Sequence, residues 1–218
     1  LLIRQNGGMN DLANQLSNHR HIPRLSVVIP IYNEEDGLSA LFDRLYPALD
    51  RVASQFSLAY EIVFVNDGST DRSAAILAMQ YEKRPDVSRV VLFANNFGQH
   101  MAIMAGFEYA RGEYIITLDA DLQNPPEEID KIVRQLEEGH DYVGTIRENR
   151  QDSWFRKNAS RAMNHLRDKM TRITMTDQGC MMRGYHRRII NLVSQCQEAN
   201  TFIPALAYTF ANNPIEIT

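Results

Sequence analysis

Short apolar runs alternate with amphipathic segments from about residue 24 to residue 146. The apolar runs are rich in Val, Ile, Leu, Phe and Tyr, which predicts strands buried on both faces of a sheet. They cover residues 25–31, 60–65, 89–93, 113–118 and 142–146. Between them, apolar residues at three- and four-residue spacing predict helices. The first such series is Leu38, Leu41, Phe42, Leu45 and Leu49.

The order of these segments predicts an α/β fold, with a mostly parallel sheet and helices on both of its faces. We expect the helices to open at residues 33–36, after a cap at Thr70 or Asp71, at Gln99, and at Pro126. In such sheets ligands bind beyond the carboxyl ends of the strands. Polar motifs stand at four of those ends: Asn33-Glu34, Asn66-Asp67, Asn95-Asn96 and Asp119-Ala-Asp121. The sequence therefore predicts one binding site at that edge.

The strand end near residue 118 carries oxygen-bearing side chains at alternate positions. Asp119, Asp121 and Gln123 can converge there, because residues i and i+2 of an extended segment point the same way. A Pro-Pro pair follows and opens a helix. Carboxylate and amide oxygens suit Mg²⁺ or Mn²⁺, which then bind substrate phosphates through their open positions. We expect a metal site formed by these three residues.

Two other strand ends each allow a structural and a functional reading. Pro30, Tyr32, Asn33 and Glu34 either end a strand and cap a helix, or line a nucleotide pocket with Tyr32 stacked near a base. Asp67 lies either in a simple turn or at a position where its carboxylate accepts a hydrogen bond from a base N–H, such as N3 of uracil. The glycine signatures of dinucleotide-binding and P-loop proteins do not occur in the sequence.

Composition narrows the class of protein. The chain has 218 residues, 44% of them hydrophobic, and a net charge of −4, which argues against nucleic acid as a partner. No apolar run reaches the ~18 residues of a membrane span. Residues 147–172 carry eight basic and three acidic side chains, a net charge of +5, so the remainder sums to −9. This basic stretch predicts a specific anionic partner.

The motifs together resemble a known family. Pro30-x-Tyr32-Asn33-Glu34, Asn66-Asp67-Gly-Ser and Asp119-x-Asp121, in this order, resemble inverting family 2 glycosyltransferases of the GT-A fold. The string from Asp119 to Glu128 is similar to enzymes that load a sugar onto a polyprenyl phosphate. Three further segments resemble the undecaprenyl-phosphate 4-deoxy-4-formamido-L-arabinose transferases of lipid A modification: 95–107, 149–157 and 201–204.

The resemblance implies a UDP-sugar donor, a polyprenyl phosphate acceptor and a metal held by Asp119, Asp121 and Gln123, with Asp121 as a catalytic residue. It places Arg147 and Arg156, as further catalytic residues, and Ser160 near donor and acceptor phosphates, with Arg183 as another candidate for phosphate binding. A basic amphipathic helix at 153–171 would lie at a membrane surface, on the cytoplasmic face of the bacterial inner membrane. Taken alone, its pattern equally fits a helix that faces the core. Whether the protein forms a homo-oligomer stays an open question. Relatives continue into membrane helices, so this chain resembles a truncated catalytic domain, itself free of the membrane.

These inferences divide the chain into three parts. Residues 1–23 are a peripheral lead-in, residues 24–146 bind the nucleotide-sugar, and residues 147–218 form the acceptor-side and membrane-proximal part of the same domain. Three alternatives stay open. The transferred sugar could be glucose or mannose, the acceptor could be a hydroxyl, which would need a catalytic base, or the chain could be a nucleotide-binding regulatory module.

Overall fold

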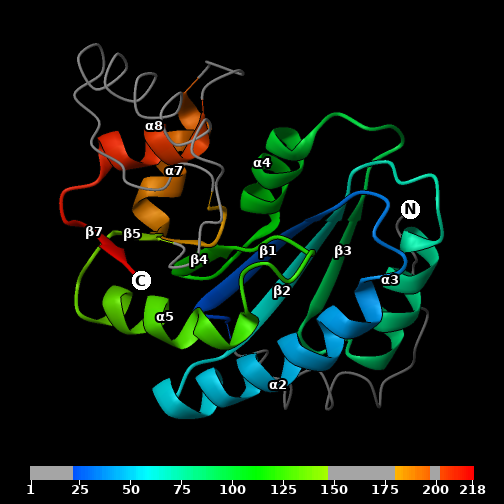
Figure 1. Cartoon of the computed structure of the whole chain (residues 1–218). Helices are drawn as coiled ribbons and strands as arrows, with labels where there is room; N and C mark the ends of the chain where they lie inside the picture. The colour runs from blue at the N-terminus through cyan, green and yellow to red at the C-terminus, as the bar shows by residue number, and fades with distance from the viewer. Residues whose placement is uncertain (1–21, 147–179, 197–201) are drawn as a thin grey trace, which may run out of the picture.

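A computed structural model describes residues 22–146, 180–196 and 202–218. Its centre is a seven-stranded sheet with the order β3-β2-β1-β4-β6-β5-β7 (Figure 1). Strands β1 to β4 pair in parallel, as do β5 and β7, whereas β6 runs antiparallel between β4 and β5. The strands are β1 (Leu25–Ile31), β2 (Tyr60–Asn66), β3 (Ser88–Leu92), β4 (Tyr114–Thr117), β5 (Tyr142–Thr145), β6 (Arg183–His186) and β7 (Pro214–Ile217). The predicted mostly parallel sheet is confirmed.

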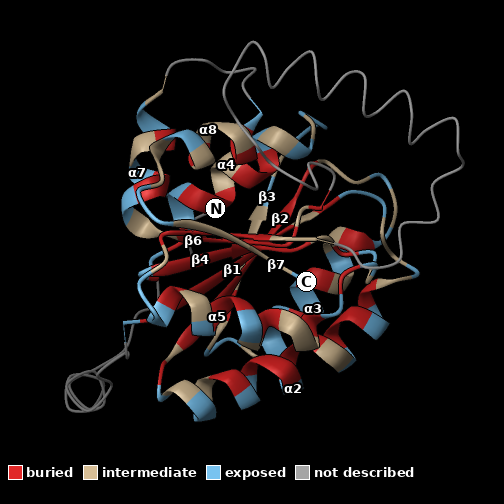
Figure 2. Ribbon diagram, turned by 60° about the vertical axis from the view of Figure 1, so that its left-hand side comes forward, coloured by how far each residue is buried: buried red, intermediate tan, exposed pale blue. Residues whose placement is uncertain are grey.

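Helices cover both faces of this sheet, also as predicted (Figures 1 and 2). One apolar core lies between the sheet and α2 (Leu38–Phe56), α3 (Ser73–Lys83) and α5 (Ile129–Glu137), the last preceded by a short 3₁₀ turn, η1 (Pro126–Glu128). A second core lies on the other face, beneath α4 (Gln99–Tyr109), α7 (Arg187–Gln195) and α8 (Ile203–Phe210). The central strands are buried on both sides because each face packs against helices.

The strand β6 was not predicted, because the sequence Arg-Gly-Tyr-His shows no apolar run. It nevertheless occupies the middle of the sheet, and its glycine explains how the helix above can approach. A Cβ atom added at Gly184 would lie 2.3 Å from the Cγ2 atom of Ile132 in α5. The strand is therefore specified by close packing and by its neighbours rather than by hydrophobicity.

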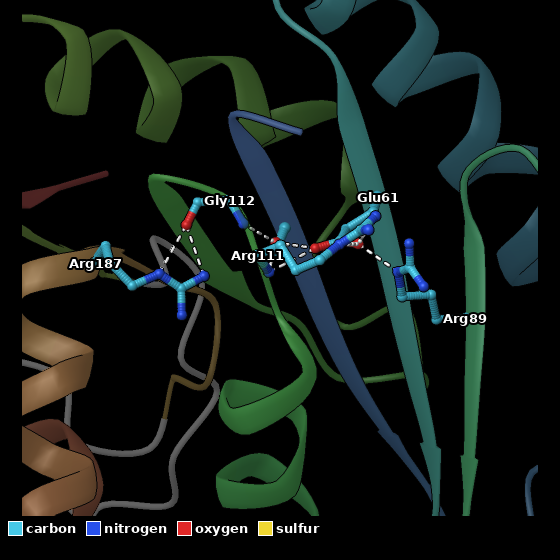
Figure 3. A network of polar contacts seen from close by, with 6 residues as sticks. Glu61, Arg89, Arg111, Gly112 and Arg187 are labelled. Carbon is cyan, nitrogen blue, oxygen red and sulfur yellow. Dashed lines mark hydrogen bonds and ion pairs between the residues drawn. The ribbon is translucent and has the colours of Figure 1, made fainter. Parts of the chain in front are cut away.

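A buried carboxylate ties strands together at the amino end of the sheet. Glu61, near the start of β2, is only 2% exposed and accepts bonds from the Ser26 hydroxyl and the Arg111 amide, at 2.8 and 2.6 Å. The guanidinium groups of Arg89 and Arg111 pair with its other oxygen, at 2.5 and 2.9 Å (Figure 3). Arg187 of α7 extends the network by donating two bonds to the Gly112 carbonyl. The network lies at the opposite end of β2 from Asp67.

Candidate functional site

A cavity of about 430 Å³ opens at the carboxyl ends of β1, β2, β3 and β4. Its volume is within the range of small-molecule sites. The last two residues of β1 and the segments that follow the four strands supply its wall, together with one residue from before β6. The lining residues are Pro30, Ile31, Tyr32, Glu34, Asp67, Asn96, Gln99, Asp119, Ala120, Asp121 and Met181. Six residues predicted from sequence thus meet in one place: Pro30, Tyr32, Glu34, Asp67, Asp119 and Asp121.

The loops after β1 and β2 are joined by hydrogen bonds, which corrects the prediction for the first helix. Helix α2 begins at Leu38, after Gly37, and not at residues 33–36. The backbone N–H groups of Asn33, Glu34 and Glu35 instead donate to side chains after β2: Ser69, Ser73 (the first residue of α3) and Asp71, respectively. The Asn33 side chain accepts from the Thr70 amide at 2.8 Å rather than capping α2. Asn33 therefore shapes this wall of the cavity.

Asp67 is buried, with only 2% of its surface exposed, and anchors the loop after β3. Its Oδ1 atom accepts from the Phe97 amide at 2.7 Å, and its Oδ2 atom accepts from the Gly98 amide at 2.8 Å and the Asn96 side chain at 3.1 Å. Because each carboxylate oxygen has two lone pairs, these bonds leave capacity for a further donor. The predicted base contact therefore stays a prediction, beside a structural role that the sequence did not reveal.

Gly68 lets the Asp67 turn approach this loop. Its φ angle is +64°, in the left-handed region that favours glycine. A Cβ atom there would lie 2.2 Å from the Asn95 carbonyl carbon, which is a backbone clash. The close contact between the loops after β2 and β3 thus requires glycine at this position.

The turn after β4 presents both aspartates to the cavity. Asp121 is exposed, and its Oδ1 atom accepts from the Gln123 amide at 3.0 Å. Leu122, between them, has a φ of +58°, which a leucine adopts only at a cost of about 1–2 kcal/mol. The Gln123 side chain is exposed and is not among the residues that line the cavity. Its assignment as a metal ligand remains a prediction.

The donor set fits a hard divalent cation. Glu34, Asp119 and Asp121 bring three carboxylates to the wall of one cavity. Burial, and after it the negative charges of Asp121 and Asp71, raise the pKa of the Glu34 carboxyl. A divalent cation would offset this accumulated charge. Among the described residues, no three His, Cys, Asp or Glu side chains gather closely enough to hold an ion alone. An ion bound to the two aspartates would then take its other ligands from amide, water or phosphate oxygens.

Arg183 does not lie where the sequence analysis placed it. Its side chain is fully buried in β6, donates to the Cys180 carbonyl at 2.7 Å, and bonds to the Tyr142 hydroxyl. It is not among the residues that line the cavity. A side chain enclosed by the sheet cannot reach a phosphate in that cavity, so we assign Arg183 to the fold rather than to substrate.

The other predicted phosphate contacts, Arg147, Arg156 and Ser160, lie outside the described residues, as does the amphipathic helix predicted at 153–171. In the ranges that the structure describes, no helix combines the length and apolarity needed to cross a bilayer.

Gln99 was missed as a cavity residue, and Asn96, although its motif was placed at a strand end, was not named as a site residue. Gln99 is the first residue of α4, and its side-chain amide donates to Asp119 Oδ1 at 2.8 Å. The strand-end position of Asn95-Asn96 was a usable signal for Asn96. Nothing in the sequence distinguishes Gln99 from an ordinary helix-opening residue.

Comparison with known proteins decides the family. The family model for "Glycosyl transferase family 2" matches residues 26–193, most of the chain. The chain belongs to glycosyl transferase family 2. Its mostly parallel sheet with helices on both faces has the GT-A fold, as predicted.

Curated members of the family are similar over most of the chain. It is 52% identical over 204 residues to the undecaprenyl-phosphate 4-deoxy-4-formamido-L-arabinose transferase of Edwardsiella ictaluri, covering 93% of this chain and 61% of that protein. The Serratia proteamaculans transferase of the same name is 50% identical, with the same coverage. The chain thus spans about three fifths of the length of these relatives.

Solved structures share the fold at lower identity. A Pyrobaculum calidifontis mannosyltransferase in complex with GDP-Man and Mn²⁺ superposes with a TM-score of 0.64 at 20% identity, covering 89% of this chain and 55% of that one. A Mycobacterium tuberculosis glucosyl-3-phosphoglycerate synthase, with Mn²⁺, UDP and phosphoglyceric acid, gives 0.57 at 21% identity, covering 86% and 62%.

Proposed function

We propose that this chain is the catalytic part of an inverting glycosyltransferase that moves a sugar from a UDP-sugar to undecaprenyl phosphate. The sugar is 4-deoxy-4-formamido-L-arabinose, and the product serves lipid A modification at the cytoplasmic face of the bacterial inner membrane. The observation that carries the proposal is the 52% identity to a transferase of that name along 93% of the chain. The carboxylate-lined cavity at the strand ends supports it independently.

We assign some cavity residues to the base of the UDP-sugar donor and others to its diphosphate. Tyr32, which is 47% exposed, offers a flat surface for a base, and Asp67 offers a carboxylate acceptor. Asp119 and Asp121, with Gln123, would hold Mg²⁺ or Mn²⁺ beside the diphosphate. When bound, that cation neutralises the charge that develops on the departing UDP. The arginines at 147 and 156 and the hydroxyl of Ser160 are proposed to hold the phosphates from outside the described residues.

The acceptor chemistry matches a site of this kind. A phosphate monoester oxygen is already anionic near neutral pH, so its attack on the anomeric carbon needs no strong general base. In-line positioning of donor and acceptor then becomes the main task of the protein. The anionic acceptor also accounts for the net charge of +5 at residues 147–172.

The test is transfer to undecaprenyl phosphate by the full-length protein in detergent, with lipid products identified by mass spectrometry. Donors are the UDP-linked formamido sugar, UDP-glucose and GDP-mannose, each with Mn²⁺ or Mg²⁺. We expect transfer from the formamido sugar, loss of it in the Asp121→Asn variant, and no transfer to a free sugar hydroxyl. Transfer from UDP-glucose alone would refute the assigned sugar, and transfer only to hydroxyl acceptors would refute the acceptor class.

A further inference from the structure

Gln99 connects two parts of the cavity that lie far apart in the sequence. It is the first residue of α4 and lines the cavity. Its Nε2 atom donates to the Oδ1 atom of Asp119, 20 residues later in the chain, at 2.8 Å. An ionised carboxylate only accepts hydrogen bonds, so the amide nitrogen and not the amide oxygen of Gln99 faces it. The bond thus has a defined direction.

The start of α4 is held rigidly, so Gln99 projects from a fixed point. Gly98, the residue before the helix, has a φ of +94° and no side chain to cap the helix. The buried carboxylate of Asp67 instead holds the two residues before the helix by accepting the Phe97 and Gly98 amides. A hydrogen bond from such an anchored side chain orders its acceptor more effectively than one from a mobile loop.

We propose that Gln99 is a positioning residue that fixes the orientation of the Asp119 carboxylate for a divalent cation, an inference that rests on the proposed function. The turn that carries Asp119 also contains the left-handed Leu122 and the exposed Asp121. A carboxylate oxygen that accepts one hydrogen bond can still bind a cation. Partners that orient metal ligands in this way typically change metal affinity by about 10- to 100-fold when they are removed.

This role differs from a direct contact with the nucleotide, although Gln99 lines the same cavity. A residue that orients Asp119 affects nucleotide binding only when metal is present. A residue that touches UDP itself affects binding with and without metal. The two roles therefore separate in a measurement that varies the metal.

The experiment compares the full-length protein with its Gln99→Met variant, which keeps the length of the side chain but lacks the donor. Mn²⁺ binding without nucleotide is measured by electron paramagnetic resonance, and UDP binding by calorimetry with and without Mn²⁺. We expect the Mn²⁺ dissociation constant to rise about 10- to 100-fold in the variant. The metal-free UDP affinity stays unchanged, and high Mn²⁺ restores kcat. Met101→Ala, two residues along the same helix and outside this cavity, is the control and leaves every value unchanged.

Each contrary outcome has a separate meaning. If UDP binding to the unchanged protein does not respond to Mn²⁺, the metal-dependent function fails, and this inference with it. If it responds, and Gln99→Met binds Mn²⁺ as tightly, the positioning role is refuted while the function stands. If Gln99→Met weakens UDP binding equally without metal, Gln99 contacts the nucleotide and the positioning role is again refuted.

Discussion

Replacing Glu61 tests whether the buried network at the amino end of the sheet stabilises the fold. In Glu61→Ala, the fully buried Ser26 hydroxyl loses its acceptor, and the Arg111 amide keeps only its longer bond, 3.2 Å, to the Ser26 Oγ atom. Arg89 and Arg111 also lose their partner, but their side chains are 37% and 46% exposed and can turn to water. Removing one member of a buried ion pair costs about 3–5 kcal/mol. The exposed arginines place Glu61→Ala at the lower end, about 3 kcal/mol.

Urea unfolding followed by circular dichroism measures this loss. With a slope of about 2 kcal/mol per molar urea, the midpoint falls by about 1.5 M. Glu82→Ala is the matched control, since this exposed carboxylate lies on the surface of α3, and its effect stays within about 0.5 kcal/mol. UDP affinity stays unchanged in folded Glu61→Ala, because the network lies at the other end of β2 from the cavity. A loss below 1 kcal/mol would refute the reasoning.

The same network predicts a pH dependence. Burial alone raises the pKa of Glu61, but hydrogen bonds from Arg89, the Arg111 amide and Ser26 outweigh it and leave that pKa below its usual 4.5. A carboxyl with a depressed folded-state pKa stabilises the fold above its unfolded-state pKa, and this contribution disappears as the pH falls through the folded-state value. The stability difference between the unchanged protein and Glu61→Gln is therefore constant from pH 7 to pH 5. It shrinks as the pH approaches 3, and a difference that grew on acidification would contradict the assignment.

Three further substitutions test the site. Gly68→Ala adds both a backbone clash and left-handed strain, so it lowers the free energy of unfolding in urea by about 2 kcal/mol or more. Gly98→Ala is the control, because Gly98 has a φ of +94° but open space around it, and this variant loses only about 1 kcal/mol. Equal losses would show that the contact with Asn95 does not matter. Arg183→Met lowers the melting temperature, because it leaves the Tyr142 hydroxyl and the Cys180 carbonyl unpaired, yet leaves the KM for UDP-sugar unchanged. A raised KM for UDP-sugar at unchanged stability would show that Arg183 contacts a substrate phosphate after all. Asp121→Asn abolishes the Mn²⁺-dependent gain in UDP affinity and leaves the metal-free UDP affinity unchanged, both measured by calorimetry. An undiminished gain would show that Asp121 is not a metal ligand.

The sequence predicts those parts of the fold whose position is determined by a run of hydrophobic residues. Strands β1 and β2 lie within a residue of their predicted bounds, because they are buried on both faces and are therefore mostly apolar, with Ser26, Glu61 and Asn66 as the polar exceptions. The start of α2 was predicted early because Asn33 resembles a helix cap. Its side chain instead bonds Thr70 in another loop, a contact between distant residues that no local pattern reveals.

In the candidate site too, some residues follow from the sequence pattern and others do not. The position of Asp119 and Asp121 beyond an apolar strand follows from the rule for parallel sheets, and the structure brings both to the cavity. The misplacement of Arg183 has a different cause. Arginine is rarely buried, so a sequence-based prediction assigns it to solvent or to phosphate. Its hydrogen-bond partners in the structure, among them Tyr142 and Cys180, show why it is buried.

The antiparallel strand β6 constrains the order in which the chain can acquire its structure during synthesis. Strand β5 has as its sheet neighbours β6 and β7, both of which are translated later. When a ribosome has released residues up to 146, β1 to β4 can pair, but β5 has nothing to pair with and one edge of β4 is open. Exposed strand edges recruit other chains. Until residue 186 emerges, this open edge makes nascent chains prone to aggregate, and slow translation there would prolong that stage.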